Sequence, residues 1–213
     1  MVLDILGCFG RIKKMYHYFL FPSLVSLIKC ENFSDIQSDL ISWIYNYQQK
    51  DEGRVLSNMG GWQSSKNPLE ERSFDRYKSY IKDHINEICN DTLNAEVILD
   101  NLWININKKN DFNWNHIHPQ SHLSGVFWVK CPKNSGTLVF DSPNNFSDHR
   151  IYQAMKKNYS TKFYMHEVSN FQPEEGSLIL FPPNLRHGVT PNLSNEDRIS
   201  IAFNLQLNLI ESE

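Results

Sequence analysis

The segment Trp114-Asn-His116-Ile-His118-Pro119 decides which fold and which chemistry we expect of this chain. Successive side chains of a β-strand point to opposite faces, so residues two apart share one face. His116 and His118 can therefore direct two imidazoles to one point. A second segment, Gly176-Ser-Leu-Ile-Leu-Phe181-Pro-Pro-Asn-Leu-Arg-His187, ends on another histidine. His187 would complete three ligands, which is how proteins hold a metal that keeps open positions for chemistry.

The other histidines are not predicted to be ligands. A lone histidine is usually a hydrogen-bonded structural or surface residue, and this interpretation applies to His17, His84, His149 and His166. His122 has the same strand parity as His118, but Pro119 lies between them and interrupts a strand. Asp141 could also enter the metal site, although it more naturally ends its strand and caps the turn at Ser142-Pro143.

The composition is typical of one globular domain. The chain has 213 residues, of which 40% are hydrophobic and 21% are charged,. A formal net charge of −3 gives no electrostatic basis for binding nucleic acid or an anionic membrane,. The four cysteines form no CxxC pair, which suits a reducing compartment. We therefore expect a cytoplasmic protein.

The amino-terminal segment of about 30 residues is rather apolar. Basic residues interrupt it before any run is long enough to span a bilayer, among them Arg11, Lys13 and Lys14,. It also lacks the order of basic, apolar and small-residue regions of a signal peptide. We expect a packed leading segment and no membrane partner.

Two helices are predicted next. Ser34 and Gln37 form a capping-box signature, and the helical apolar pattern that follows continues until Gly53,. A second amphipathic helix is predicted from about Ser73 to Asn90. The intervening loop is rich in glycine and polar residues. It is interpreted either as a surface connection or as the edge of a pocket, with Trp62 over a substrate.

From Ala95 onward the helical period is replaced by short strands separated by turns. The predicted strands are 95–107, 113–118, 122–131, 136–141, 162–168, 176–182, 186–190 and 198–208,. The series has the size of a barrel or jelly roll. We therefore predict a single mainly β domain over 1–213, in which a helical portion (1–94) packs on a jelly-roll, cupin-like barrel (95–208).

The last predicted strand alternates strictly between apolar and polar residues. Its polar face carries Arg198, Ser200 and Asn204, and this face meets either solvent or the floor of a polar pocket,. The histidines favour the pocket, because they need a shared interior. Trp103, Asn105 and Asn107 share one face of another predicted strand and could line the same cavity, as could Trp128. Aromatic core packing is an equal alternative for both tryptophans.

Several segments together resemble a family of 2-oxoglutarate (2OG)/Fe(II) oxygenases found in marine bacteria and their phages. The similar segments follow one another in the family's order and span roughly residues 20–208: Leu20-Phe21-Pro22, Ser57-Asn58-…-Gly61-Trp62-Gln63-Ser64, Asn115-His116-Ile-His118-…-Ser124-Gly125-Val-Phe-Trp-Val, Ser135-Gly136-…-Phe140-Asp141-Ser-Pro143, Phe181-Pro182-…-His187-Gly-Val-…-Pro191 and Arg198-Ile-Ser200.

This resemblance implies a double-stranded β-helix that holds iron at its open end. It implies that His116, His118 and His187 are the iron ligands, and that Arg198 and Ser200 bind the distal carboxylate of 2OG. The implied activity is hydroxylation of an unidentified small-molecule or side-chain substrate, using Fe(II), 2OG and O₂ and releasing succinate and CO₂. Jelly-roll oxygenases often pair, so a homodimer is one expected assembly, although no segment marks an interface.

The chain departs from the wider superfamily at His118, which stands where a His-x-Asp/Glu…His pattern has its carboxylate. A carboxylate would bring a negative charge to the iron, whereas a third histidine brings none. Two alternatives therefore stay open. One is a three-histidine, cupin-type metalloenzyme that does not use 2OG. The other is a non-catalytic jelly-roll binding module.

Overall fold

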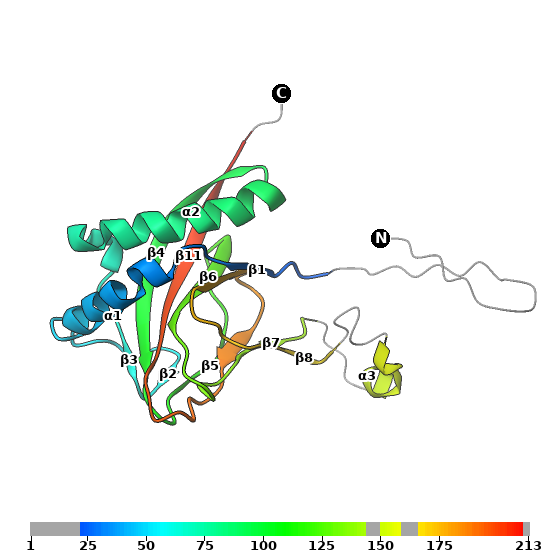
Figure 1. Ribbon diagram of the computed structural model, residues 1–213. Helices are drawn as coiled ribbons and strands as arrows, with labels where there is room; N and C mark the ends of the chain where they lie inside the picture. The colour runs from blue at the N-terminus through cyan, green and yellow to red at the C-terminus, as the bar shows by residue number, and fades with distance from the viewer. Residues whose placement is uncertain (1–21, 144–149, 159–165, 211–213) are drawn as a thin grey trace, which may run out of the picture.

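The computed structural model describes residues 22–143, 150–158 and 166–210. Strands dominate these residues and form two antiparallel sheets (Figure 1). The larger sheet has the order β1-β9-β6-β11-β4-β3, with β1 Ser26–Lys29, β9 Ser177–Phe181, β6 Leu123–Lys130, β11 Arg198–Leu209, β4 Ala95–Asn107 and β3 Trp62–Gln63. The smaller sheet has the order β2-β5-β10-β7-β8, with β2 Asn58–Met59, β5 Phe112–His116, β10 His187–Val189, β7 Leu138–Asp141 and β8 Val168–Phe171. This arrangement confirms the predicted jelly-roll architecture.

Two long helices cover the outer face of the larger sheet (Figure 1). They are α1 (Ser34–Gln48) and α2 (Asp75–Thr92), and two 3₁₀ turns, η1 (Pro68–Glu70) and η2 (Arg72–Phe74), precede α2. A short helix, α3 (Arg150–Ala154), follows β7. Within the described residues, none of the helices combines the length and the apolar character needed to span a membrane.

The predicted capping box at the start of α1 does not form. Phe33 occupies the N-cap position, and the Ser34 hydroxyl donates to the Asp35 carboxylate instead of accepting from a backbone N–H,. The Gln37 side chain reaches away from the helix and donates to the Val129 carbonyl, at 3.0 Å. Gln37 therefore attaches α1 to β6, and this tertiary contact replaces the local one that the sequence pattern suggests.

The hydrophobic core has two parts. The larger part lies between the helices and the larger sheet, where the apolar residues of β11 meet buried side chains of α1 and α2 such as Leu40, Ile44 and Ile81. Each fully buried aliphatic side chain of this kind contributes about 1.5–3 kcal/mol to stability. The smaller part consists of Trp128, Leu138, Phe140, Ile179, Phe181 and Leu185. Since the apolar face of β11 packs on the helices, its polar face is directed to the space between the sheets.

The predicted boundary at residue 94 does not separate helices from sheets. Strands β1, β2 and β3 precede it in the chain, and they belong to both sheets. Strand β4 has the predicted bounds, 95–107. A strand was predicted at 162–168, and β8 is found at Val168–Phe171. Residues 162–165 lie outside the described residues, as do Leu20 and Phe21 of the first segment that resembles the oxygenase family.

Candidate metal centre

Three histidines meet between the two sheets. His116 ends β5 and His187 begins β10, and the two are cross-strand partners. His118 lies two residues beyond β5, where its backbone N–H donates to the Pro183 carbonyl at 2.9 Å. One ring nitrogen from each histidine lies within 4.8 Å of the other two. The structure thus brings together the three residues that the sequence predicts as metal ligands.

Backbone carbonyls orient two of the imidazoles. The Nδ1 atom of His116 lies 2.7 Å from the Trp114 carbonyl oxygen, and that of His187 lies 2.8 Å from the Leu185 carbonyl oxygen. A carbonyl oxygen only accepts, so Nδ1 carries the proton and Nε2 keeps its lone pair for a metal. No such partner is found for Nδ1 of His118 among the described residues.

The spacing of the ring nitrogens fits one metal ion. The Nε2 atoms of His118 and His187 are 3.2 Å apart. Two nitrogens that bind a metal at about 2.1 Å and at a right angle lie about 3 Å from each other. The donor set of three neutral imidazoles suits a first-row transition metal, iron among them.

Burial keeps these histidines neutral. It lowers the pKa of His118 to about 3 and that of His187 to about 4, and neighbouring imidazoles add to both shifts. The pKa of His116 is also lowered, first by burial, although its bond to Trp114 opposes the shift. At neutral pH the three rings therefore offer lone pairs to a metal without first releasing a proton.

The rival ligands lie elsewhere. Nδ1 of His122 accepts the backbone N–H of Leu207 at 2.9 Å. The Asp141 carboxylate accepts the side-chain amide of Asn115 at 2.8 Å. Neither residue belongs to the cluster found within the described part of the chain, nor do His84 and His166. His17 and His149 lie outside the described residues.

Arg198 is buried next to the histidines. It and Ser200 line a narrow inner pocket together with all three of them. The guanidinium is 1% exposed, and its Nη1 donates to the carbonyls of Ser135 and Thr190, the latter at 3.1 Å. Desolvation lowers the pKa of Arg198 to about 10, so the side chain stays charged at neutral pH.

No carboxylate of the described residues forms a direct ion pair with this buried charge, although Asp111 interacts with it at longer range. Nη2 of Arg198 is buried without a hydrogen-bond partner, and no ion pair to the guanidinium is found among the described residues. An unpaired buried cation is costly, which makes the position suited to an anionic ligand. A carboxylate fits best, because a guanidinium can bind it through two parallel hydrogen bonds.

A glycine permits the close packing around Arg198. Gly136 has φ 89°, which a side chain rarely tolerates, and a Cβ added there would lie 2.7 Å from Nη1 of Arg198,. The backbone of residues 135 and 136 can therefore approach the guanidinium closely. This contact gives a physical reason for the Ser135-Gly136 pair in the sequence.

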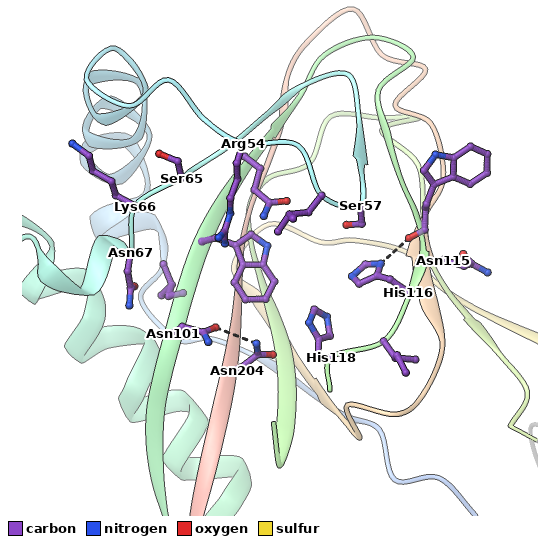
Figure 2. A pocket seen from close by; sticks show the side chains of 16 residues that line it. Arg54, Ser57, Ser65, Lys66, Asn67, Asn101, Asn115, His116, His118 and Asn204 are labelled. Carbon is purple, nitrogen blue, oxygen red and sulfur yellow. Dashed lines mark hydrogen bonds between the residues drawn. The ribbon is translucent and has the colours of Figure 1, made fainter. Parts of the chain in front are cut away.

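A wider outer cavity, of about 640 Å³, adjoins the inner pocket and shares His116, His118, Trp103 and Ser57 with it. Figure 2 shows the two labelled histidines on one side of this cavity and Asn101 with Asn204 on the other. Most of the predicted lining residues lie where expected: Trp103, Asn105, Asn107 and Trp128 line the inner pocket, and Trp103 and Asn204 line the outer cavity.

Trp62 is the exception, and the structure corrects its prediction. It lines neither pocket, and its indole N–H donates to the Asp51 carbonyl at 2.9 Å on the helix side of the sheet. The next residue, Gln63, lines the outer cavity instead. Strand β3 has only two residues, which is too short for an alternating pattern to show which of them faces inward.

Sequence reasoning also missed several residues of the outer cavity. Arg54, Gln63, Asn101 and Trp114 line it. Asn101 could have been found, because it shares the strand parity of Trp103 and Asn105. Arg54 carries no such signal, since it stands in a loop outside any regular strand.

The comparisons with known proteins agree with this geometry. Residues 101–204 match the model of a family described as "Putative 2OG-Fe(II) oxygenase". No curated protein sequence matches the chain. The fold is similar to that of a prolyl-4-hydroxylase from Pseudomonas putida, with a TM-score of 0.57 and 12% identity over 88% of this chain and 93% of the other.

Two further solved structures share the fold. HygX from Streptomyces hygroscopicus, with nickel and 2OG bound, gives a TM-score of 0.58 and 13% identity over 85% of this chain and 81% of that one. A prolyl hydroxylase from Trichoplax adhaerens gives a TM-score of 0.58 and 15% identity over 86% of this chain and 82% of that one. The family match contains the three histidines and Arg198, and the structures share the barrel that holds them. These findings support a 2OG-Fe(II) oxygenase, because the family model covers the part of the chain that carries the candidate site and the fold is similar over most of the chain.

Proposed function

We propose that this oxygenase hydroxylates its substrate at a three-histidine iron site. In this proposal His116, His118 and His187 hold Fe(II), while Arg198 and Ser200 bind the distal carboxylate of 2OG. The observation that carries the proposal is the buried guanidinium of Arg198, whose Nη2 has no partner in the described chain and which lines the same pocket as the histidines. A cosubstrate carboxylate would supply the missing partner.

Iron and 2OG, when bound, supply the oxidising chemistry, in which O₂ oxidises a C–H bond while 2OG is converted into succinate and CO₂. The protein contributes orientation and exclusion of water. The Trp114 and Leu185 carbonyls hold two imidazoles in the tautomer that leaves Nε2 free. The rings of Phe140 and Phe181 pack beside His187, with centroid distances of 5.8 and 4.6 Å, and keep that side of the pocket dry.

A cupin-type metalloenzyme that does not use 2OG is the second candidate. The observation that favours it is His118, since a third neutral ligand replaces the carboxylate of the wider superfamily. This candidate gives no role to the unpaired Arg198. A purely binding function is disfavoured further, because it explains neither Arg198 nor three convergent imidazoles.

Turnover of 2OG tests the proposal. The purified chain, supplied with Fe(II), 2OG and O₂, should form succinate above the level of a His187→Ala variant, even without primary substrate. Succinate formation equal to that of the variant, in a protein that binds Fe(II), would favour the cupin-type candidate.

The primary substrate is proposed to be a small molecule or a side chain. The similar structures include HygX with hygromycin B bound and the prolyl hydroxylase in complex with a peptide fragment, so this barrel accommodates both kinds. We also propose a cytoplasmic location, because Cys30, Cys89 and Cys131 are all free thiols,. Formation of a homodimer stays a prediction.

A further inference from the structure

The residues that line the outer cavity indicate the chemical class of the primary substrate. This inference rests on the proposed function. Its volume of about 640 Å³ lies in the range of small-molecule sites,. The described residues that line it include no Asp or Glu, although the chain has 24 acidic and 21 basic residues overall. The lining thus lacks acidic side chains in a chain whose net charge is negative, although the Asp51 and Asp100 carboxylates lie behind it, bonded to the lining residues Ser65, Lys66 and Asn101.

A row of cross-strand partners leads from the cavity rim to the inner pocket. Arg54 forms an isolated bridge with Gln63, Gln63 pairs with Asn105, and Asn105 pairs with Ser200. Directly opposite residues of an antiparallel pair direct their side chains to the same face. Gln63 therefore faces the interior that also holds Ser200, the proposed cosubstrate residue, and Arg54, which is exposed, lies on the same face at the mouth of the cavity.

Arg54 is a cation without a protein partner. Figure 2 shows its side chain extending from its loop into the cavity, whereas Lys66 points away. Its side chain forms no ion pair or hydrogen bond within the described residues; the ion pairs found there are Arg76–Asp39 and Lys130–Glu196. The backbone N–H of Arg54 donates to the Gln63 carbonyl at 2.8 Å, which fixes where the side chain begins.

Side-chain amides add further donors to the cavity wall. Gln63 is 3% exposed, lines the cavity and makes no side-chain hydrogen bond within the described residues. The Ser124 hydroxyl donates to Oδ1 of Asn204 at 2.8 Å, and Nδ2 of Asn204 donates to Oδ1 of Asn101 at 3.1 Å. Nδ2 of Asn101 also donates to the Asp100 carboxylate at 3.2 Å. Each amide NH₂ has two N–H groups and uses one of them in these bonds, so each asparagine keeps a second N–H that can donate to a ligand.

We propose that the primary substrate carries an anionic group, a carboxylate or a phosphate, which pairs with Arg54 in the outer cavity. The amides of Gln63, Asn101 and Asn204 donate to the same group or to polar atoms beside it. A guanidinium binds both kinds of anion through two parallel hydrogen bonds. In this proposal Arg198 binds the carboxylate of the cosubstrate, and Arg54 binds the anionic group of the substrate.

Protection from chemical modification tests this proposal on the metal-free chain. Phenylglyoxal modifies accessible guanidinium groups, and peptide mapping by mass spectrometry gives the rate at each arginine. Inorganic phosphate and acetate serve as probes, each compared with chloride at equal ionic strength. If an anion binds at Arg54 with a dissociation constant near 20 mM, about 50 mM of it should slow the modification of Arg54 roughly threefold. Arg72, an exposed arginine outside the cavity, is the internal control and should not be protected.

The probes distinguish the two sources of negative charge. Protection by phosphate alone identifies a phosphate-bearing substrate, and protection by acetate identifies a carboxylate. If neither anion protects Arg54 more than it protects Arg72, the proposal is overturned. Since the experiment contains no metal and no 2OG, such a failure leaves the proposed oxygenase activity intact, and that activity is judged separately by succinate formation.

Discussion

At the scale of single residues, His118 decides how this site differs from the common iron site of two histidines and one carboxylate. Three neutral imidazoles leave the full charge of the metal in the pocket, so an anionic ligand such as 2OG is attracted by both the metal and Arg198. The missing protein carboxylate therefore need not weaken the cosubstrate site.

His187→Ala should abolish Fe(II) binding, because it removes a buried ligand whose orientation is held by the Leu185 carbonyl. His166→Ala is the matched control, since His166 is not part of the cluster. The measurement is iron content after equilibrium dialysis. Equal iron retention in both variants would mean that the three histidines do not form the metal site.

Arg198→Ala should weaken 2OG binding by at least about tenfold, since a charge-assisted hydrogen bond contributes about 1.5–3 kcal/mol. Fe(II) binding should survive, because the histidines are untouched. Titration of the iron-loaded variant with 2OG checks this, with circular dichroism to confirm the fold. Arg198→Lys, which keeps the charge but not the planar fork, should fall between the variant and the wild type. An unchanged 2OG affinity in Arg198→Ala would remove the cosubstrate from this position.

Strand alternation predicted this part of the site well. It put Arg198, Ser200 and Asn204 on one inward face, because the long strand β11 keeps a two-residue period,. It also predicted that His116 and His118 converge, although His118 lies two residues beyond the end of β5. It could not place Trp62 or find Arg54, whose positions depend on a two-residue strand and on a loop. The side-chain environment of Arg198, including its unpaired Nη2, depends on backbone carbonyls far apart in the sequence, and no local pattern encodes them.

At the scale of elements, one buried carboxylate organises the wall of the outer cavity. Asp51, 5% exposed, accepts hydrogen bonds from the backbone N–H groups of Gly53, Ser65 and Lys66 and from the Ser65 hydroxyl. These bonds connect the end of α1 to the segment that carries Gln63 and lines the cavity. Burial alone would raise the pKa of Asp51, but the hydrogen bonds together lower it.

Asp51→Ala should therefore reduce the free energy of unfolding at neutral pH by about 3 kcal/mol, because it leaves several buried donors unsatisfied. Asp51→Asn should cost less, since the amide oxygen still accepts. Urea unfolding followed by circular dichroism measures both. A loss below about 0.5 kcal/mol in Asp51→Ala, the size usual for exposed surface positions, would show that the carboxylate does not hold this segment.

The contribution of Asp51 should also depend on pH. Its pKa is lower in the folded chain than the unfolded value of about 3.9, so the ionised carboxylate stabilises the fold fully above that value,. This stabilisation is lost as the pH falls through the folded pKa. The difference in melting temperature between the wild type and Asp51→Ala should therefore shrink between neutral pH and about pH 3. A difference that stays constant over this range would contradict the ionised role.

At the scale of the whole molecule, the two sheets carry different residues of the proposed site. The larger sheet buries one face against α1 and α2, and this hydrophobic core supports that side of the barrel. Its other face carries Arg198 and Ser200, while the smaller sheet carries His116 and His187. The proposed cosubstrate and metal positions thus lie on opposite sheets, and the proposed reaction site is the space between them.

The sequence predicted the jelly roll because eight short segments with turns between them leave few alternatives. It did not predict that β1, β2 and β3, from the helical amino-terminal portion, extend both sheets. Two of these strands have only two residues each, and tertiary pairing rather than a local pattern determines such short strands.

The most direct test of the three-histidine oxygenase site is the anaerobic addition of Fe(II) and then 2OG to the purified chain. Chelation of iron by the keto acid gives a weak visible charge-transfer band. We expect the band to appear in the wild type, to require a higher 2OG concentration in Arg198→Ala and to be absent in His187→Ala. A wild-type protein that binds Fe(II) tightly but shows no band at saturating 2OG would contradict the proposed site.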